Sequence, residues 1–188
     1  MTRIFLPLVF LHFVGLVAGV TTGVVYGTSR DIASAQRSLA HVLQWDWFSV
    51  HFLCGLAVAV LTLFVHCLVF TYFLGTGRWV KEVAYAYGLP DQPWPKRTRE
   101  LKRQAFPPAL LAMLLTIVLV ASGAAAQVGA WPWWIHLGLA GAAVLANFFA
   151  WTVEYRAISE NIVVLDRVMA EVQRLASTSN DDNDDTPT

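Results

Sequence analysis

The sequence predicts an all-α membrane protein, a transmembrane four-helix bundle with both termini in the cytoplasm and a cytoplasmic helical extension at its C-terminal end. Three observations predict this fold class. Hydrophobic residues make up 56% of the 188 residues and charged residues only 14%, whereas about 25% of a soluble domain is charged. Four apolar stretches are each long enough to cross a bilayer. Lysine and arginine are concentrated on one side of these stretches.

The four predicted spans divide the chain. Each has the roughly 20 apolar residues that cross about 30 Å of hydrocarbon. They run from about Ile4 to Tyr26, from about Trp47 to Leu74, from about Phe106 to Gln127 and from about Trp131 to Tyr155. The first is longer than the apolar core of a secretory signal, so we interpret it as a retained span. The spans form a bundle over residues 1–157, followed by a cytoplasmic helix at 158–176 and a disordered acidic tail at 177–188.

The distribution of basic side chains predicts the orientation. The connection between the second and third spans, residues 75–104, carries seven of the 13 lysines and arginines. Arg3 and the three arginines after Tyr155 lie on the same side, whereas the connection after the first span carries only Arg30 and Arg37. By the positive-inside rule both termini are cytoplasmic, and we expect a multi-pass protein of the bacterial inner membrane. The net charge of zero gives no reason to expect a nucleic-acid partner.

Four histidines lie inside predicted spans, and their depths match in two pairs. At about 1.5 Å per residue, His12 lies roughly 12 Å after the start of the first span and His66 roughly 12 Å before the end of the second, at a shared inner level. His51 and His136 lie about 6 Å and 7 Å after the starts of the second and fourth spans, at a shared outer level. Imidazole nitrogen can hold haem iron, and two axial imidazoles favour electron transfer over oxygen binding. We therefore predict one haem between each pair.

Both haems would be of the non-covalent b type, because the chain has no C-x-x-C-H motif for covalent attachment. Small residues near these histidines would let a flat macrocycle pass close to the backbone. Gly15 and Gly19 lie on the face of His12, and Gly55 lies one turn after His51. The same glycines also fit tight packing between membrane helices, so both interpretations stay open.

Basic side chains near the span ends could bind the haem propionates. Arg30 and Arg37 are candidates on the outer side, and Arg78 and Lys81 are candidates on the inner side. Each could equally be an ordinary interfacial anchor. His41, in the outer connection, is interpreted as a solvated loop histidine, with a role near a quinone or haem edge as the alternative.

Charged groups are missing from the middle of the predicted spans. Asp46 and Glu154 both fall at span ends. Proton pumps and ion-coupled transporters usually need charged groups within the membrane, so the sequence disfavours these classes.

Apolar residues recur beyond the fourth span at spacings of four and three, which is typical of a short helical seam. They are Ile158, Ile162, Leu165, Met169, Val172 and Ala176. This seam could join two protomers into a homo-oligomer, or it could pack against the inner connection of its own chain.

Four spans with paired histidines at two levels resemble the four-helix di-haem b-type cytochromes. This class includes membrane subunits of formate dehydrogenases and hydrogenases and the haem-bearing anchors of quinone-linked dehydrogenases. The resemblance covers about residues 4–155 and rests on His12, His51, His66 and His136 and the glycines near them. It implies electron transfer across the lipid bilayer between a quinone or quinol and a redox partner protein. The third span contributes no histidine, which differs from some members of the class. The alternative function is a haem-free membrane scaffold or an anchor subunit of a larger complex.

Overall fold

The chain forms four long helices. A computed structural model describes residues 1–35 and 46–184, with side chains described for residues 1–28 and 46–178. The helices are α1 (Thr2–Ala35), α2 (Trp47–Ala86), α3 (Trp94–Gln127) and α4 (Trp133–Asp184). All four are long and apolar enough to cross a membrane. The predicted all-α four-helix bundle is therefore confirmed.

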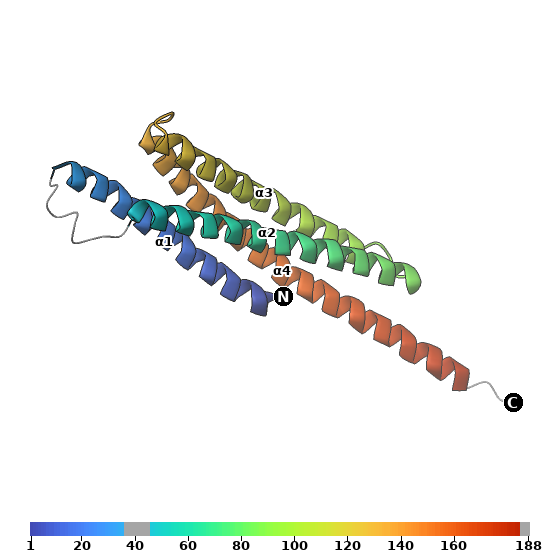
Figure 1. The fold of residues 1–188 in the computed structure, drawn as a ribbon. Helices are drawn as coiled ribbons and strands as arrows, with labels where there is room; N and C mark the ends of the chain where they lie inside the picture. Colours follow the sequence, from blue (N-terminus) through green and yellow to red (C-terminus); the bar gives the residue numbers. More distant parts are fainter. Residues whose placement is uncertain (36–45, 185–188) are drawn as a thin grey trace.

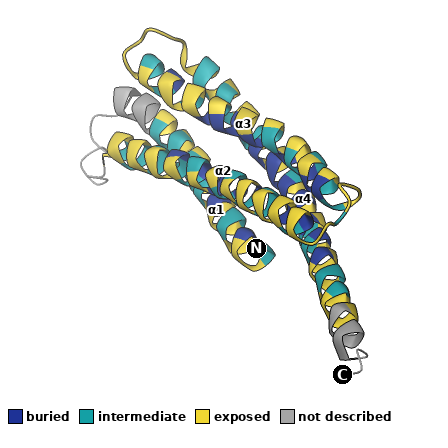
Figure 2. Ribbon diagram, turned by 90° about the vertical axis from the view of Figure 1, so that its right-hand side faces the viewer, coloured by how far each residue is buried: buried dark blue, intermediate teal, exposed yellow. Residues whose placement is uncertain are grey.

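The helices pack in the order of the chain (Figure 1). Neighbouring helices make the main contacts, and α1 and α4 touch only loosely. Small residues allow α3 and α4 to approach closely, because Ala109 and Ala112 on α3 and Ala143 and Ala150 on α4 are almost fully buried. Exposed positions cover the outside of the bundle (Figure 2), and many of them carry large apolar side chains, as expected for a surface that faces lipid.

A groove of about 390 Å³ marks the loose contact between α1 and α4. Its lining side chains are apolar apart from one threonine and the tryptophan ring nitrogen. They are Phe13, Leu16, Val17, Val20, Thr21, Val144, Leu145, Phe148 and Trp151.

Glycines end α2 and α3. Gly88 has φ +63° and Gly129 has φ +76°, backbone angles that favour glycine. In each case the next residue returns to the last turn of the helix, with Leu89 N–H donating to the Ala84 carbonyl and Ala130 N–H donating to the Ala125 carbonyl. This is the hydrogen-bond pattern of a glycine-terminated helix. We call the two ends of the bundle the α2–α3 end and the α3–α4 end after these turns.

The connection at the α2–α3 end is shorter than predicted. We placed the connection between the two spans at residues 75–104, but α2 continues to Ala86 and α3 begins at Trp94. The extra turns remain helical because they have a core to cover, in which Val80 and Leu101 are fully buried. With 40 residues, α2 is about 60 Å long, twice the thickness of bilayer hydrocarbon. The helices therefore project beyond the membrane at this end.

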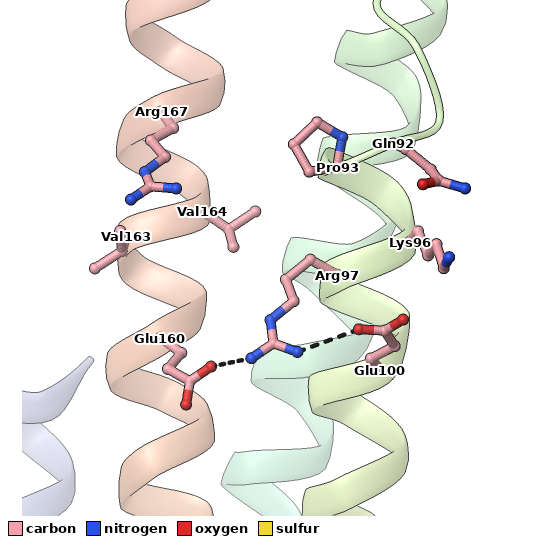
Figure 3. A pocket seen from close by; sticks show the side chains of 9 residues that line it. All are labelled: Gln92, Pro93, Lys96, Arg97, Glu100, Glu160, Val163, Val164 and Arg167. Carbon is pink, nitrogen blue, oxygen red and sulfur yellow. Dashed lines mark hydrogen bonds and ion pairs between the residues drawn. The ribbon is translucent and has the colours of Figure 1, made fainter.

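Ion pairs fix this projecting end. Arg97 on α3 contacts Glu160 on α4 and Glu100 on its own helix (Figure 3). These side chains line a cavity of about 500 Å³ between the start of α3 and the projecting part of α4. In the turn, both carboxylate oxygens of Asp91 accept hydrogen bonds from Arg99, at 3.0 and 2.8 Å. These bonds from Arg99 hold the pKa of the Asp91 carboxyl below its usual value.

The projecting part of α4 packs against its own chain. Ile158, Val164 and Val168 are buried in one cluster with Val80 of α2 and Leu101 of α3. Met169, predicted to lie on the seam, is 44% exposed. The buried face is thus centred about one position away from the predicted seam. A homo-oligomer through residues 158–176 remains a prediction.

The end of α4 also differs from the expected boundary. We expected the acidic tail to start at Ser177, but helical backbone continues to Asp184. The hydroxyl groups of Ser177 and Thr178 donate to the Arg174 carbonyl, within the helix. Residues 185–188 lie outside the described part of the chain, so disorder of the tail stays a prediction.

A pair of substitutions tests the packing of the α4 projection. Ile158→Ala should lower the free energy of unfolding by about 2–5 kcal/mol, because it opens a cavity at a fully buried position. Val163→Ala, five positions further along and 47% exposed, should change the free energy by less than about 0.5 kcal/mol. Denaturant unfolding of the purified protein in detergent measures both. Equal effects would contradict the assignment of this face to the core.

Candidate functional site

The outer histidine pair lies near the α3–α4 end of the bundle. His51 comes from the second turn of α2 and His136 from the first turn of α4. Their ring centroids are 6.2 Å apart and the ring planes are inclined by 79°. Both rings are half-buried. The pair that depth predicted from the sequence is therefore brought together in the structure.

Each ring of the outer pair is held by a hydroxyl group and a glycine of the preceding helix. Nδ1 of His51 lies 3.3 Å from Thr22 Oγ1, and Nδ1 of His136 lies 3.0 Å from Ser122 Oγ. A Cβ atom on the next residue would lie 2.9 Å from Cε1 of His51 at position 23, and 3.0 Å from Cε1 of His136 at position 123. Both positions are glycine, which lets each ring lie against the helix backbone. We call Thr22–Gly23 and Ser122–Gly123 the two seats.

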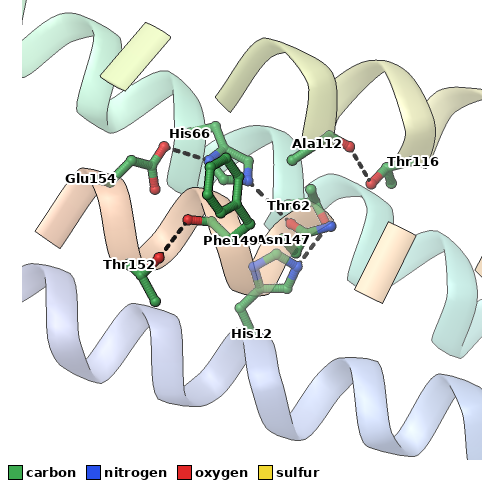
Figure 4. Close-up of polar contacts among 9 residues, drawn as sticks. All are labelled: His12, Thr62, His66, Ala112, Thr116, Asn147, Phe149, Thr152 and Glu154. Carbon is green, nitrogen blue, oxygen red and sulfur yellow. Dashed lines mark hydrogen bonds and ion pairs between the residues drawn. The ribbon is translucent and has the colours of Figure 1, made fainter. Parts of the chain in front are cut away.

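The inner pair lies deeper in the bundle and is fully buried (Figure 4). The ring centroids of His12 on α1 and His66 on α2 are 6.4 Å apart, with an interplanar angle of 77°. Nε2 of His12 lies 2.7 Å from Thr62 Oγ1. Both nitrogens of His66 contact α4, with Nδ1 2.7 Å from Glu154 Oε1 and Nε2 3.1 Å from Asn147 Oδ1.

The separations in both pairs fit two imidazoles on one metal ion. A metal–nitrogen bond is about 2 Å long, so two bonds plus the distances from each nitrogen to its ring centre add up to about 6 Å. Within the described residues, no group of three or more histidine, cysteine or acidic side chains could hold a metal ion. An ion between two of these rings would thus need further ligands from outside the chain, as a macrocycle provides.

The two pairs differ in how readily they could accept such a group. The hydroxyl contacts of the outer pair use Nδ1 on both rings, which leaves Nε2 of His51 and His136 for a metal. At the inner pair, three of the four ring nitrogens are engaged by Thr62, Asn147 and Glu154. The exception is Nδ1 of His12, which is buried without a partner among the described residues. Both pairs therefore fit one metal ion by distance, but only the inner pair has hydrogen bonds to its ring nitrogens that a metal would have to replace.

The glycines predicted to give room for a macrocycle have different surroundings. A Cβ at Gly15 would lie 3.1 Å from Val58, so this glycine serves close packing of α1 on α2. A Cβ at Gly19 or Gly55 would meet no other described atom within 4 Å. Space is thus available at these two positions.

Of the predicted propionate partners, Arg78 and Lys81 have described side chains, and neither is brought to a histidine pair. Arg78 forms an exposed ion pair with Glu82 one turn away, at 2.8 Å, and Lys81 is also exposed. Arg30 lies in the last turns of α1, where only the backbone is described. Arg37 and His41 lie outside the described residues, so their predicted roles stay predictions.

Several buried polar residues of α4, two of which contact His66, were not predicted from the sequence. We placed Glu154 at the end of its span, but the structure buries it completely against His66. Asn147, Glu154 and Asn161 are fully buried and recur every seven residues on α4. That spacing puts three polar side chains on one helix face, a signal that was present in the sequence.

Trp151 of α4 contacts the inner pair through its aromatic ring. Its ring lies 5.0 Å from the ring of His12, at 72°, and its Nε1 is buried without a partner in the described part of the chain. It also lines the groove between α1 and α4.

Comparisons with protein-family models, with curated proteins and with solved structures find no match to the chain. The functional argument therefore depends on the geometry of the two histidine pairs.

Proposed function

We propose that the chain is an electron-transfer protein of the bacterial inner membrane that holds two b haems, one between His12 and His66 and one between His51 and His136. The observation that carries this proposal is the separation of the ring centroids, 6.4 and 6.2 Å in two pairs at different depths of one bundle. If the two pairs had unrelated roles, their ring centroids would have no reason to be separated by nearly the same distance. Haem, when bound, supplies an iron centre that carries one electron at a time.

The residues of the chain would orient the ligands and exclude water. Thr22 and Ser122 hold the outer rings, and the carboxylate of Glu154 holds Nδ1 of His66, a contact that typically fixes a metal-binding histidine. The inner rings are fully buried, so water has no access to that level. The outer rings are half-buried and lie closer to the membrane surface.

The distribution of basic residues supports an orientation in the membrane, and the proposed haems suggest the partners. By the positive-inside rule, the basic residues near the α2–α3 end support a cytoplasmic position of that end and of both termini. A quinone or quinol in the bilayer and a redox partner protein would be the two ends of the electron path, as the resemblance to di-haem b-type cytochromes implies.

The first test is a spectrum. The purified protein should show a reduced-minus-oxidised α band of b haem and about two haems per chain. Absence of the band after expression with added haem would overturn the proposal. It would then favour a haem-free membrane scaffold or anchor subunit, for which the hydrogen-bonded state of the inner pair is the supporting observation.

A further inference from the structure

The contacts of the outer pair allow the protons on its imidazole rings to be assigned. A serine hydroxyl has one proton to donate. The hydroxyl of Ser122 donates it to the Leu119 carbonyl at 2.7 Å. The Leu119 carbonyl can only accept, so we assign the hydroxyl proton to it and the donor role in the 3.0 Å contact to Nδ1 of His136. In a neutral ring the lone pair is then on Nε2.

The same reasoning applies to His51. The hydroxyl proton of Thr22 is directed to the carbonyls of Ala18 and Gly19, at 2.9 and 3.1 Å. With the proton assigned to these carbonyls, Thr22 Oγ1 accepts from Nδ1 of His51, 3.3 Å away. Nε2 of His51 carries the lone pair as well. The two seats thus impose one tautomer on both rings.

The inner pair has the opposite arrangement at His12. If the proton of Thr62 is assigned by the same rule to the Val58 carbonyl at 2.8 Å, its oxygen accepts from Nε2 of His12 at 2.7 Å. The lone pair of His12 is then on Nδ1, the atom without a partner. This ring presents a different nitrogen from those of the outer pair.

His66 has no lone pair free for a metal in this arrangement. Asn147 donates its amide to the Ala143 carbonyl at 2.8 Å, which fixes the side-chain oxygen toward Nε2 of His66. Nε2 therefore carries a proton. Nδ1 is occupied by the Glu154 carboxyl group at 2.7 Å. His66 can bind a metal only after it gives up one of these contacts.

We propose that Thr22 and Ser122 set the tautomers of His51 and His136. Together with Gly23 and Gly123, these hydroxyl residues hold the outer rings ready to bind a metal. The inner rings have to exchange hydrogen bonds before they can do so. The coordination part of this inference rests on the proposed function, but the tautomers do not. The outer site consequently takes up haem before the inner site.

The tautomers are tested without haem. The full-length chain, labelled with ¹⁵N in histidine and kept in detergent before haem is supplied, should give Nδ1–H signals for His51 and His136 and an Nε2–H signal for His12. Ser122→Ala and Thr22→Val should each release the ring held by that hydroxyl into a tautomer mixture. Ser122→Thr and Thr22→Ser keep the hydroxyl and should keep the wild-type signal. A wild-type Nε2–H signal at either outer ring would overturn the assignment.

The seats are tested by haem titration. Ser122→Ala should weaken binding at the outer site about 10–100-fold, as loss of a contact to a metal-binding histidine typically does. Gly23→Ala and Gly123→Ala should prevent binding there, because the added Cβ would lie at 2.9 and 3.0 Å from the rings. Gly27→Ala and Gly141→Ala are matched controls, since both positions are exposed with no other described atom within 4 Å.

The outcomes separate the two proposals. If the wild type binds no haem, the proposed function fails, and the nitrogen signals alone decide whether the seats set the tautomers. If the wild type binds haem but Ser122→Ala and Ser122→Thr bind equally well, the seats have no role in positioning. If the first haem added occupies the inner site, the order of uptake proposed here is wrong.

Discussion

His136→Ala should remove one haem and leave the other, and so reduce the haem content of the purified protein by about half. The reason is that His136 reaches only His51 among the other three histidines of the two pairs, at 6.2 Å between ring centroids. The inner rings lie on α1 and α2 and contact α4 through Asn147, Trp151 and Glu154, none of which belongs to the outer pair. Haem content and the EPR spectrum of the oxidised protein measure the result.

Three further variants serve as internal controls. His51→Ala should leave the same single haem as His136→Ala, whereas His12→Ala and His66→Ala should each leave the other one. The two outer-pair variants should therefore share one EPR spectrum, and the two inner-pair variants should share a different one. Loss of both haems in any single variant that still folds, or loss of neither, would contradict the pairing.

The pairing by depth could be predicted because it depends only on helix rise and direction. Counting residues from the span ends puts His12 level with His66 and His51 level with His136, and the structure places these rings 6.4 and 6.2 Å apart. The fold class followed from composition, since apolar stretches of this length have few alternatives to membrane helices. Neither prediction changes if the end of a predicted span is wrong by a few residues.

The surroundings of the rings could not be predicted in the same way. Whether Gly23 or Gly19 lies under the ring of His51 depends on how α1 is rotated and shifted against α2. One turn of a helix separates these two glycines, and hydropathy does not fix the register to that precision. Tight approach of the backbone occurs at Gly23 and Gly123, which were not among the predicted glycines.

Glu154 was missed for a related reason. The fourth span was ended at Tyr155 because hydropathy falls there, so the carboxyl group was assigned to the interface. In the structure α4 continues as one helix and its apolar face continues to be buried, at Ile158 and Val168. Burial in this region comes from packing against the projecting turns of α2 and α3, which composition alone does not reveal.

Glu154→Ala should destabilise the protein by about 3–5 kcal/mol, because it leaves the fully buried Nδ1 of His66 without its partner. Glu160→Ala is the matched control. Glu160 lies on the same helix and also pairs with a basic side chain, Arg97, but it is 52% exposed. An exposed ion pair typically contributes about 0–1 kcal/mol, since water and salt screen it. Denaturant unfolding in detergent measures the difference between the two variants.

Glu154→Gln refines this comparison, because it keeps an oxygen that can accept from Nδ1 of His66 while removing the carboxylate charge. We expect a loss of stability smaller than that of Glu154→Ala and larger than that of Glu160→Ala. If Glu154→Ala and Glu160→Ala unfold at the same denaturant concentration, the contact between Glu154 and His66 does not stabilise the bundle. In that case the carboxyl group could not be what orients His66, and the inner histidine pair would need another explanation.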